Sequence, residues 1–209
     1  MTVRVMLVSP AMNAALREAR FDGDAPLDPA GERAARAAAD AAPKADRMLS
    51  GPSERCLATA AALGLAADRE PALAGWDLGR WSGRRLDEVG AAEPDAVAAW
   101  IGDPRAAPHG GESLRDLLER VGGRLDAIGI GGVGGLGGQA DVGGAAGGSV
   151  VAVVEPAVVR AAVVHGLKLP VEAFWRLDVA PLSLTELSGR SGRWNVRLGR
   201  PLAAAPYGL

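Results

Sequence analysis

The sequence has few of the residues that build covalent cross-links or metal centres, with one cysteine and two histidines among 209 residues. The single cysteine, Cys56, excludes an intrachain disulfide, which fits a protein of the reducing cytoplasm. His109 and His165 lie far apart in the sequence, and there is no second cysteine to complete a ligand set. We therefore expect no metal site, and nothing in the sequence indicates a cofactor.

The chain also lacks an excess of one charge and has no long apolar run. Its 23 basic and 25 acidic residues give a formal net charge of −2, so we do not expect a nucleic-acid partner. Residues 1–7 lack the apolar core of a signal peptide, and no apolar run approaches the roughly 18–20 residues that span a bilayer. We expect a cytoplasmic protein whose partner is an unknown small molecule or protein. A homodimer stays open.

Strand and helix patterns alternate along most of the chain. Asp28 and Pro29 form a typical helix start, with a carboxylate cap followed by proline in the first turn. The predicted strands are 3–8, 47–50, 150–154, 183–187 and 194–198, and the predicted helices are 11–20, 29–42, 53–63, 86–100 (interrupted at Gly90 and Pro94), 112–128 and 156–167. This order predicts one α/β domain over residues 1–209, with three α/β/α layers, a mostly parallel sheet and a C-terminal antiparallel hairpin.

Residues 129–148 contain eleven glycines and almost no large side chain. Such a segment buries too little surface to offset the entropy lost on ordering, so we predict a flexible surface loop. The segment contains a Gly-x-Gly-x-x-Gly match at Gly129, Gly131 and Gly134. A dinucleotide site needs a strand before this motif and a helix after it, whereas here a helix precedes and a strand follows. The match therefore does not indicate a cofactor.

Three predicted strands end in turns that meet at one edge of a parallel sheet. The turns are Ser9-Pro10, Ser50-Gly51-Pro52 and Glu155-Pro156. Ligands of such sheets bind beyond the carboxyl ends of the strands. The sequence therefore predicts a pocket at this edge.

Several segments, in order along nearly the whole chain, are similar to those of one known family. Residues 7–11 stand where that family has an Arg-His-Gly motif, and residues 49–60 resemble its Ser-x-Pro-x-x-Arg-x-x-x-Thr-Ala segment. Residues 73–83 resemble an acidic loop that ends in Gly-x-Trp-x-Gly, residues 110–113 resemble a Gly-Glu-Ser helix start, and residues 153–160 stand where a second catalytic histidine precedes a helix. On these motifs the chain resembles the histidine phosphatase superfamily, which includes the phosphoglycerate mutases, and the resemblance implies a phosphoglycerate mutase-like fold.

The resemblance also implies which positions would do the chemistry. In the family the first histidine becomes phosphorylated, two arginines and the second histidine hold the phosphoryl oxygens, and an acidic residue protonates the leaving group. Here Ser9 stands at the first arginine, Pro10 at the nucleophilic histidine, Glu155 at the second histidine and Gly75 at the acid. Arg55 alone matches the family motif, so we name no catalytic residue with assurance.

Arg55 and Glu155 carry opposite charges at neighbouring positions of the implied site. We predict that they form an ion pair in place of the phosphate. Glu155 also precedes a helix start, where a carboxylate is favourable whatever the function. Three further residues are candidates for binding a ligand. Asn13 follows the altered first motif, Asp77 lies two residues beyond Gly75, and His109 lies in a loop expected at the rim of the pocket. For Asp77 the alternative is a hydrogen bond to its own backbone.

Three functions stay open. The first hypothesis is a pseudoenzyme that binds a small molecule or partner through the former phosphate pocket. The second is an enzyme with a repurposed pocket that uses Glu155 and Asp77 as acid and base. The third is residual phosphatase or mutase activity with an unconventional nucleophile, to be sought among Ser9, Glu155 and Cys56.

Overall fold

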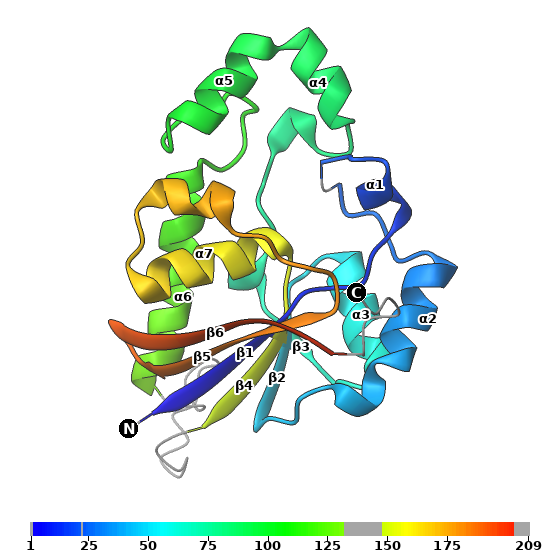
Figure 1. The fold of residues 1–209 in the computed structure, drawn as a ribbon, viewed down its shortest axis with the longest axis vertical. Coiled ribbons are helices and arrows are strands. Elements are labelled where there is room, and N and C mark those ends of the chain that lie inside the picture. Colours follow the sequence, from blue (N-terminus) through cyan, green and yellow to red (C-terminus); the bar gives the residue numbers. More distant parts are fainter. Residues whose placement is uncertain (1, 22, 132–147, 203–209) are drawn as a thin grey trace, which may run out of the picture.

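The computed structural model describes residues 2–21, 23–131 and 148–202 (Figure 1). Its centre is a six-stranded sheet with the strand order β3-β2-β4-β1-β5-β6. β1, β2, β3 and β4 run in parallel, whereas β5 pairs antiparallel with both β1 and β6. The strands are β1 (Val3–Val8), β2 (Arg47–Ser50), β3 (Asp68–Arg69), β4 (Ser149–Val153), β5 (Ser183–Arg190) and β6 (Arg193–Pro201). The predicted mostly parallel sheet with a C-terminal antiparallel pair is confirmed.

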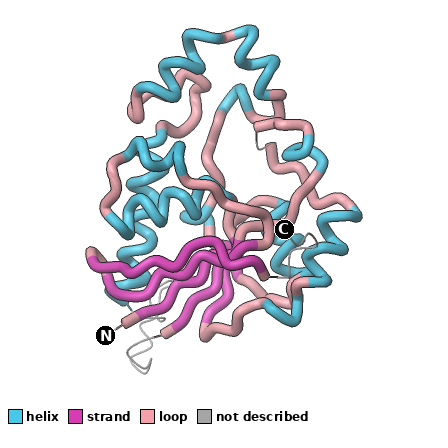
Figure 2. Tube along the Cα trace, in the orientation of Figure 1, coloured by secondary structure: helices cyan, strands magenta, loops and turns pink. Residues whose placement is uncertain are grey.

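Helices cover both faces of the sheet (Figures 1 and 2). They are α1 (Ala14–Arg17), α2 (Pro29–Ala37), α3 (Glu54–Ala62), α4 (Leu86–Ala92), α5 (Pro94–Gly102), α6 (Leu114–Gly131) and α7 (Pro156–Leu167). Side chains of α6 and α7 form one buried cluster with the sheet, and side chains of α3 form a second cluster on the opposite face. The three-layer α/β/α arrangement is therefore as predicted.

The alternation of side chains along β1 explains these two clusters. Val5 and Leu7 pack with α6 and α7, while Met6 and Val8 pack with α3. Successive side chains of a strand point to opposite faces, so a strand that is apolar throughout requires cover on both sides. Each fully buried valine or leucine contributes on the order of 1.5–3 kcal/mol.

The predicted helix over 11–20 is wrong at both ends. α1 comprises only Ala14–Arg17 and begins after Asn13, whose Oδ1 accepts a hydrogen bond from the Leu16 amide at 3.0 Å. The Ala11 amide instead donates to Thr59 Oγ1 at 3.2 Å. This tertiary bond ties the start of the segment to α3 and overrides the helix propensity of alanine.

The interruptions predicted within 86–100 are half correct. α4 runs through Gly90, because one glycine weakens a helix by only about 1 kcal/mol. The break comes at Glu93, and Pro94 lies in the first turn of α5. Proline lacks the amide that would continue the preceding helix, so it separates the two helices.

The loop predicted over 129–148 is wrong for its first three residues, because α6 continues to Gly131. At Gly129 a Cβ atom would lie 2.6 Å from the Ser191 backbone nitrogen, so a glycine lets α6 approach the turn between β5 and β6. Residues 132–147 lie outside the described part of the chain, and for them the loop stays a prediction.

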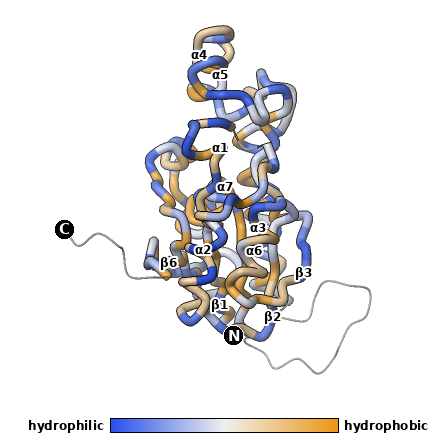
Figure 3. Tube along the Cα trace, turned by 90° about the vertical axis from the view of Figure 1, so that its right-hand side faces the viewer, coloured by the Kyte–Doolittle hydropathy of each residue, from blue (hydrophilic) through white to orange (hydrophobic). Residues whose placement is uncertain are grey.

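α4 and α5 lie at the end of the molecule farthest from the sheet (Figures 1 and 3). Their apolar side chains join a third core cluster that contains Trp81, Val89 and Trp100. The Trp81 and Trp100 rings meet edge to face with centroids 5.6 Å apart, and Phe21 stacks on Trp81 at 5.6 Å. Among the described residues, no helix combines the length and the apolarity needed to cross a membrane.

Candidate functional site

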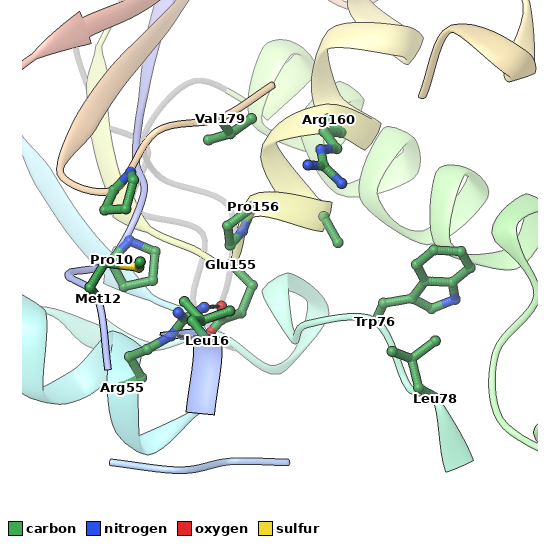
Figure 4. Close-up of a pocket in the computed structure, with 12 residues that line it drawn as sticks. Pro10, Met12, Leu16, Arg55, Trp76, Leu78, Glu155, Pro156, Arg160 and Val179 are labelled. Atoms are coloured by element: carbon green, nitrogen blue, oxygen red, sulfur yellow. Dashed lines mark hydrogen bonds and ion pairs between the residues drawn. The ribbon is translucent and has the colours of Figure 1, made fainter. Parts of the chain in front are cut away.

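A pocket of about 380 Å³ opens beyond the carboxyl ends of β1 and β4 (Figure 4). This volume lies within the range of small-molecule sites. We call Arg55 and Glu155 the floor of the pocket. Its wall includes the side chains of Met12, Leu16, Trp76, Leu78, Arg160 and Val179. The pocket thus lies at the sheet edge that the sequence indicates.

The floor is a buried ion pair, as predicted. Arg55 Nη2 donates to Glu155 Oε2, and Arg55 Nε donates to Oε1 at 3.3 Å. The Arg55 and Glu155 side chains are only 3% and 4% exposed. Ser53 Oγ and the Cys56 thiol also donate to Oε1, at 2.8 and 3.4 Å. The carboxylate therefore has several donors in an almost completely buried position, and the floor carries no net charge.

Local sequence sets the position of each floor residue. Ser53 caps α3, its hydroxyl accepting from the Cys56 amide at 3.2 Å, and this places Arg55 in the first turn of the helix. Glu155 lies two residues after the end of β4 and precedes Pro156, the first residue of α7. β2 and β4 are parallel neighbours, so the turns after them lie side by side. Residues a hundred positions apart in sequence meet for this reason.

The turn after β1 offers no nucleophile to the pocket. Ser9 is buried, its hydroxyl donates to the Ala180 carbonyl, and it accepts from the Ser183 amide at 3.1 Å. Pro10 lines the pocket but has neither a reactive side-chain atom nor an amide N–H. The turn therefore serves packing, and no group in it is placed to attack a phosphoryl group.

The family model of the histidine phosphatase superfamily (branch 1) matches residues 11–200. The chain belongs to this superfamily.

Relatives within the superfamily are named as phosphatases. A glucosyl-3-phosphoglycerate phosphatase of Mycolicibacterium vanbaalenii is 40% identical over 103 residues, which make up 46% of this chain and 46% of that protein. The match thus spans less than half of that relative. The structure of a mycobacterial glucosyl-3-phosphoglycerate phosphatase has a TM-score of 0.78 at 26% identity, over 96% of this chain and 100% of that one. A putative α-ribazole-5′-phosphate phosphatase of Escherichia coli, at 18% identity over 98% and 99% of the two chains, has a TM-score of 0.79, a likeness of fold alone.

At the acidic position of the superfamily motif, this chain places no carboxylate in the lining that the structure describes. The Gly75 carbonyl accepts from Arg120 Nη2 at 3.1 Å. Asp77 is exposed, is absent from the lining, and accepts from the Gly79 amide at 2.9 Å. Gly79 has φ 47°, and a Cβ there would lie 2.3 Å from the His109 carbonyl oxygen. Asp77 thus holds the turn that packs against His109, and its contact with a ligand stays a prediction.

Asn13 and His109, two other candidates, are buried outside the pocket lining. The Asn13 side chain caps α1 and donates to the Ala25 carbonyl at 2.9 Å. His109 Nδ1 accepts from the Gly111 amide at 3.1 Å, and its ring centroid lies 6.5 Å from that of Trp76. Burial lowers the pKa of His109, with Asp77 opposing and Arg80 adding to the effect. Both side chains support the pocket from behind, and the predicted ligand contacts stay untested.

Arg160, which lines the wall from α7, is not among the candidate residues predicted from the sequence. It follows Pro156 by one helical turn, so a side chain at this spacing shares the face of α7 that meets the pocket. Its guanidinium carbon lies 5.8 Å from the centroid of the Phe174 ring. Burial lowers the pKa of Arg160 and Asp178 partly offsets this, and the group stays positively charged at neutral pH. Its i+4 spacing from Pro156 was the signal that could have placed Arg160 at the pocket.

The described residues do not form a ligand set for a metal ion. Within the described ranges, no group of three His, Cys, Asp or Glu side chains is placed to hold a metal ion. His165 Nε2 lies 3.0 Å from Asp126 Oδ2, in a separate surface groove between α6 and α7. His165 is therefore remote from the pocket chemistry.

Proposed function

We propose that this chain is a non-catalytic member of the histidine phosphatase superfamily that binds a small molecule in the pocket. The observation that carries the proposal is the floor, where a carboxylate occupies Arg55 at the position that the family's phosphate would use. Pro10 supports it, because the family's covalent route needs a nucleophile at that position. The cytoplasmic location expected from the sequence belongs to the same proposal.

The size of the electrostatic effect favours loss of phosphate binding. At an effective dielectric constant of about 20, two unit charges about 4 Å apart interact with roughly 4 kcal/mol. A phosphate dianion at the floor would meet Glu155 as a like charge and would compete with it for Arg55. We therefore expect weak affinity for phosphate.

Phosphomonoester hydrolysis is the second candidate, and the comparisons favour it because relatives of this chain are named as phosphatases. It would require a nucleophile other than Pro10. Ser9 is bonded to the Ala180 carbonyl, and Cys56 is buried beside the Glu155 carboxylate, which repels a thiolate. An acid–base pair of Glu155 and Asp77 receives less support, because Glu155 is held by Arg55 while Asp77 faces solvent.

Phosphate release from a panel of phosphomonoesters, including glucosyl-3-phosphoglycerate, decides between the two. A glucosyl-3-phosphoglycerate phosphatase is the positive control, and Arg55→Met reveals hydrolysis by contaminating enzymes. We expect background rates from the wild type and from Arg55→Met alike. Turnover by the wild type that Arg55→Met abolishes, while that variant stays folded by circular dichroism, would refute the proposal.

A further inference from the structure

Arg160 forms no ion pair with any described residue, and it lies in a pocket whose other charges, Arg55 and Glu155, cancel. Its Nε is buried, and in the described part of the chain no hydrogen-bond partner lies near that atom. None of the ion pairs among the described residues includes Arg160, and Asp178 acts on it only over a longer distance. Because Arg160 lines the pocket and its charge is not neutralised by an ion pair with a described residue, an anionic ligand acceptor at its guanidinium would be favoured.

The charges along the lining define how much negative charge a ligand can carry. Arg55 and Glu155 neutralise each other in the floor. Arg160 therefore leaves the lining with one net positive charge. One guanidinium matches a single carboxylate, to which it donates two parallel hydrogen bonds. A dianion would leave its second charge unmatched beside Glu155.

The remainder of the wall is apolar. Met12 and Leu16 approach from the segment after β1, and Trp76 stands across the pocket from them (Figure 4). The Trp76 indole N–H is already used, since it donates to the Glu112 carbonyl at 2.7 Å. Trp76 therefore presents only its apolar ring surface, which suits the carbon skeleton of a ligand.

We propose that the pocket selects organic acids that combine one carboxylate, bound by Arg160, with an apolar body packed against Met12, Leu16 and Trp76. This inference rests on the proposed binding function and names its ligand class. A ligand of this class differs from a phosphomonoester, because its anionic group binds Arg160 in the wall and not Arg55 in the floor.

Three probes with the same ring system test the charge requirement: naphthoate, naphthamide and naphthyl phosphate. Isothermal titration of the full chain compares their affinities for the wild type, Arg160→Met and Arg160→Lys. Arg36→Met is the matched control, because Arg36 is 68% exposed on α2, outside the lining. We expect naphthoate to bind the wild type roughly 10- to 100-fold more tightly than naphthamide. Arg160→Met should remove this preference, Arg160→Lys should keep part of it, and Arg36→Met should keep it all.

Each other result overturns the inference in a distinguishable way. Equal binding of naphthoate and naphthamide, or a preference that survives Arg160→Met, would contradict the ligand class but leave a binding pocket. Absence of binding by all three probes would also contradict the ligand class. Tighter binding of naphthyl phosphate together with its hydrolysis would overturn both the ligand class and the proposed function. Thermal unfolding confirms that each variant is folded before titration.

Discussion

Two arginines line the same pocket in opposite circumstances. In the floor, Arg55 is 3% exposed and bonded to Glu155 through two nitrogens. In the wall, Arg160 is partly exposed and forms no ion pair within the described residues. An internal counter-ion converts the first arginine into a structural element, whereas the second keeps its charge for a ligand. The difference teaches that an arginine in a pocket lining is available to a ligand only where the protein does not already supply it with a carboxylate.

Removing one partner of the floor should have the largest effect on stability. Glu155→Leu leaves the Arg55 guanidinium buried without this carboxylate, and breaking a buried pair costs about 3–5 kcal/mol. Urea unfolding at pH 7, followed by circular dichroism, measures the change. A loss below about 1 kcal/mol would show that the floor is solvated and would remove the contrast with the wall.

Replacing both floor residues should reverse most of that loss. The double variant Arg55→Met with Glu155→Leu buries no charge, and such replacements are often neutral or stabilising. We expect its free energy of unfolding to lie within about 1 kcal/mol of the wild type, measured in the same urea series. A loss as large as that of Glu155→Leu alone would mean that Ser53 and Cys56 depend on the carboxylate.

Much of the fold was predictable because its signals are local. Asp28 caps α2, Pro156 begins α7, and the apolar run at β4 has the cover on both faces that its composition requires. The two-residue strand β3 was not predictable, because its pairing with β2 depends on backbone position and not on its exposed side chains. The extent of α1 was missed because the bond from Ala11 to Thr59 is tertiary.

The functional site likewise has a part that the sequence predicted and a part that it did not. The meeting of Arg55 with Glu155 followed from parallel strand order, which sequence patterns indicate well. The surroundings of Asn13 and His109 did not, because hydrogen bonds to Ala25 and Gly111 are set by loop geometry. The role of Arg160 depends on its having no ion-pair partner among the described residues, and no sequence spacing encodes such a tertiary feature.

The buried His109 behind the wall should make the free energy of unfolding depend moderately on pH. Burial lowers its pKa below the ordinary value of 6.5, so below that pH the unfolded chain binds a proton that the folded chain does not. Stability from this group is complete above about pH 6.5 and falls with decreasing pH, by at most about 1.4 kcal/mol per pH unit.

Urea unfolding at about pH 7 and about pH 5.5 isolates this contribution when variants are compared. His109→Asn keeps an acceptor for the Gly111 amide but does not titrate, so its stability should fall less between the two pH values. His165→Asn, outside the pocket, is the control and should keep the His109 contribution. Equal slopes for wild type and His109→Asn would contradict a neutral buried imidazole.

The smallest effect is expected at Arg160. Its side chain forms no ion pair with a described residue, so Arg160→Met should change the free energy of unfolding by less than about 1 kcal/mol. Comparison with Glu155→Leu in the same urea series completes the contrast between wall and floor. A loss above about 3 kcal/mol would assign Arg160 a structural role and weaken the case for a ligand there.

Ser9 has a consequence for the energetics of binding. Its hydroxyl and that of Ser183 both donate to the Ala180 carbonyl, between the lining residues Val179 and Pro181. This segment is thus tethered to β1 before any ligand arrives. A preorganised lining loses little conformational entropy on complex formation, so more of the contact energy appears as affinity. Through these two hydrogen bonds Ser9 and Ser183 hold this part of the lining in one shape before a ligand binds.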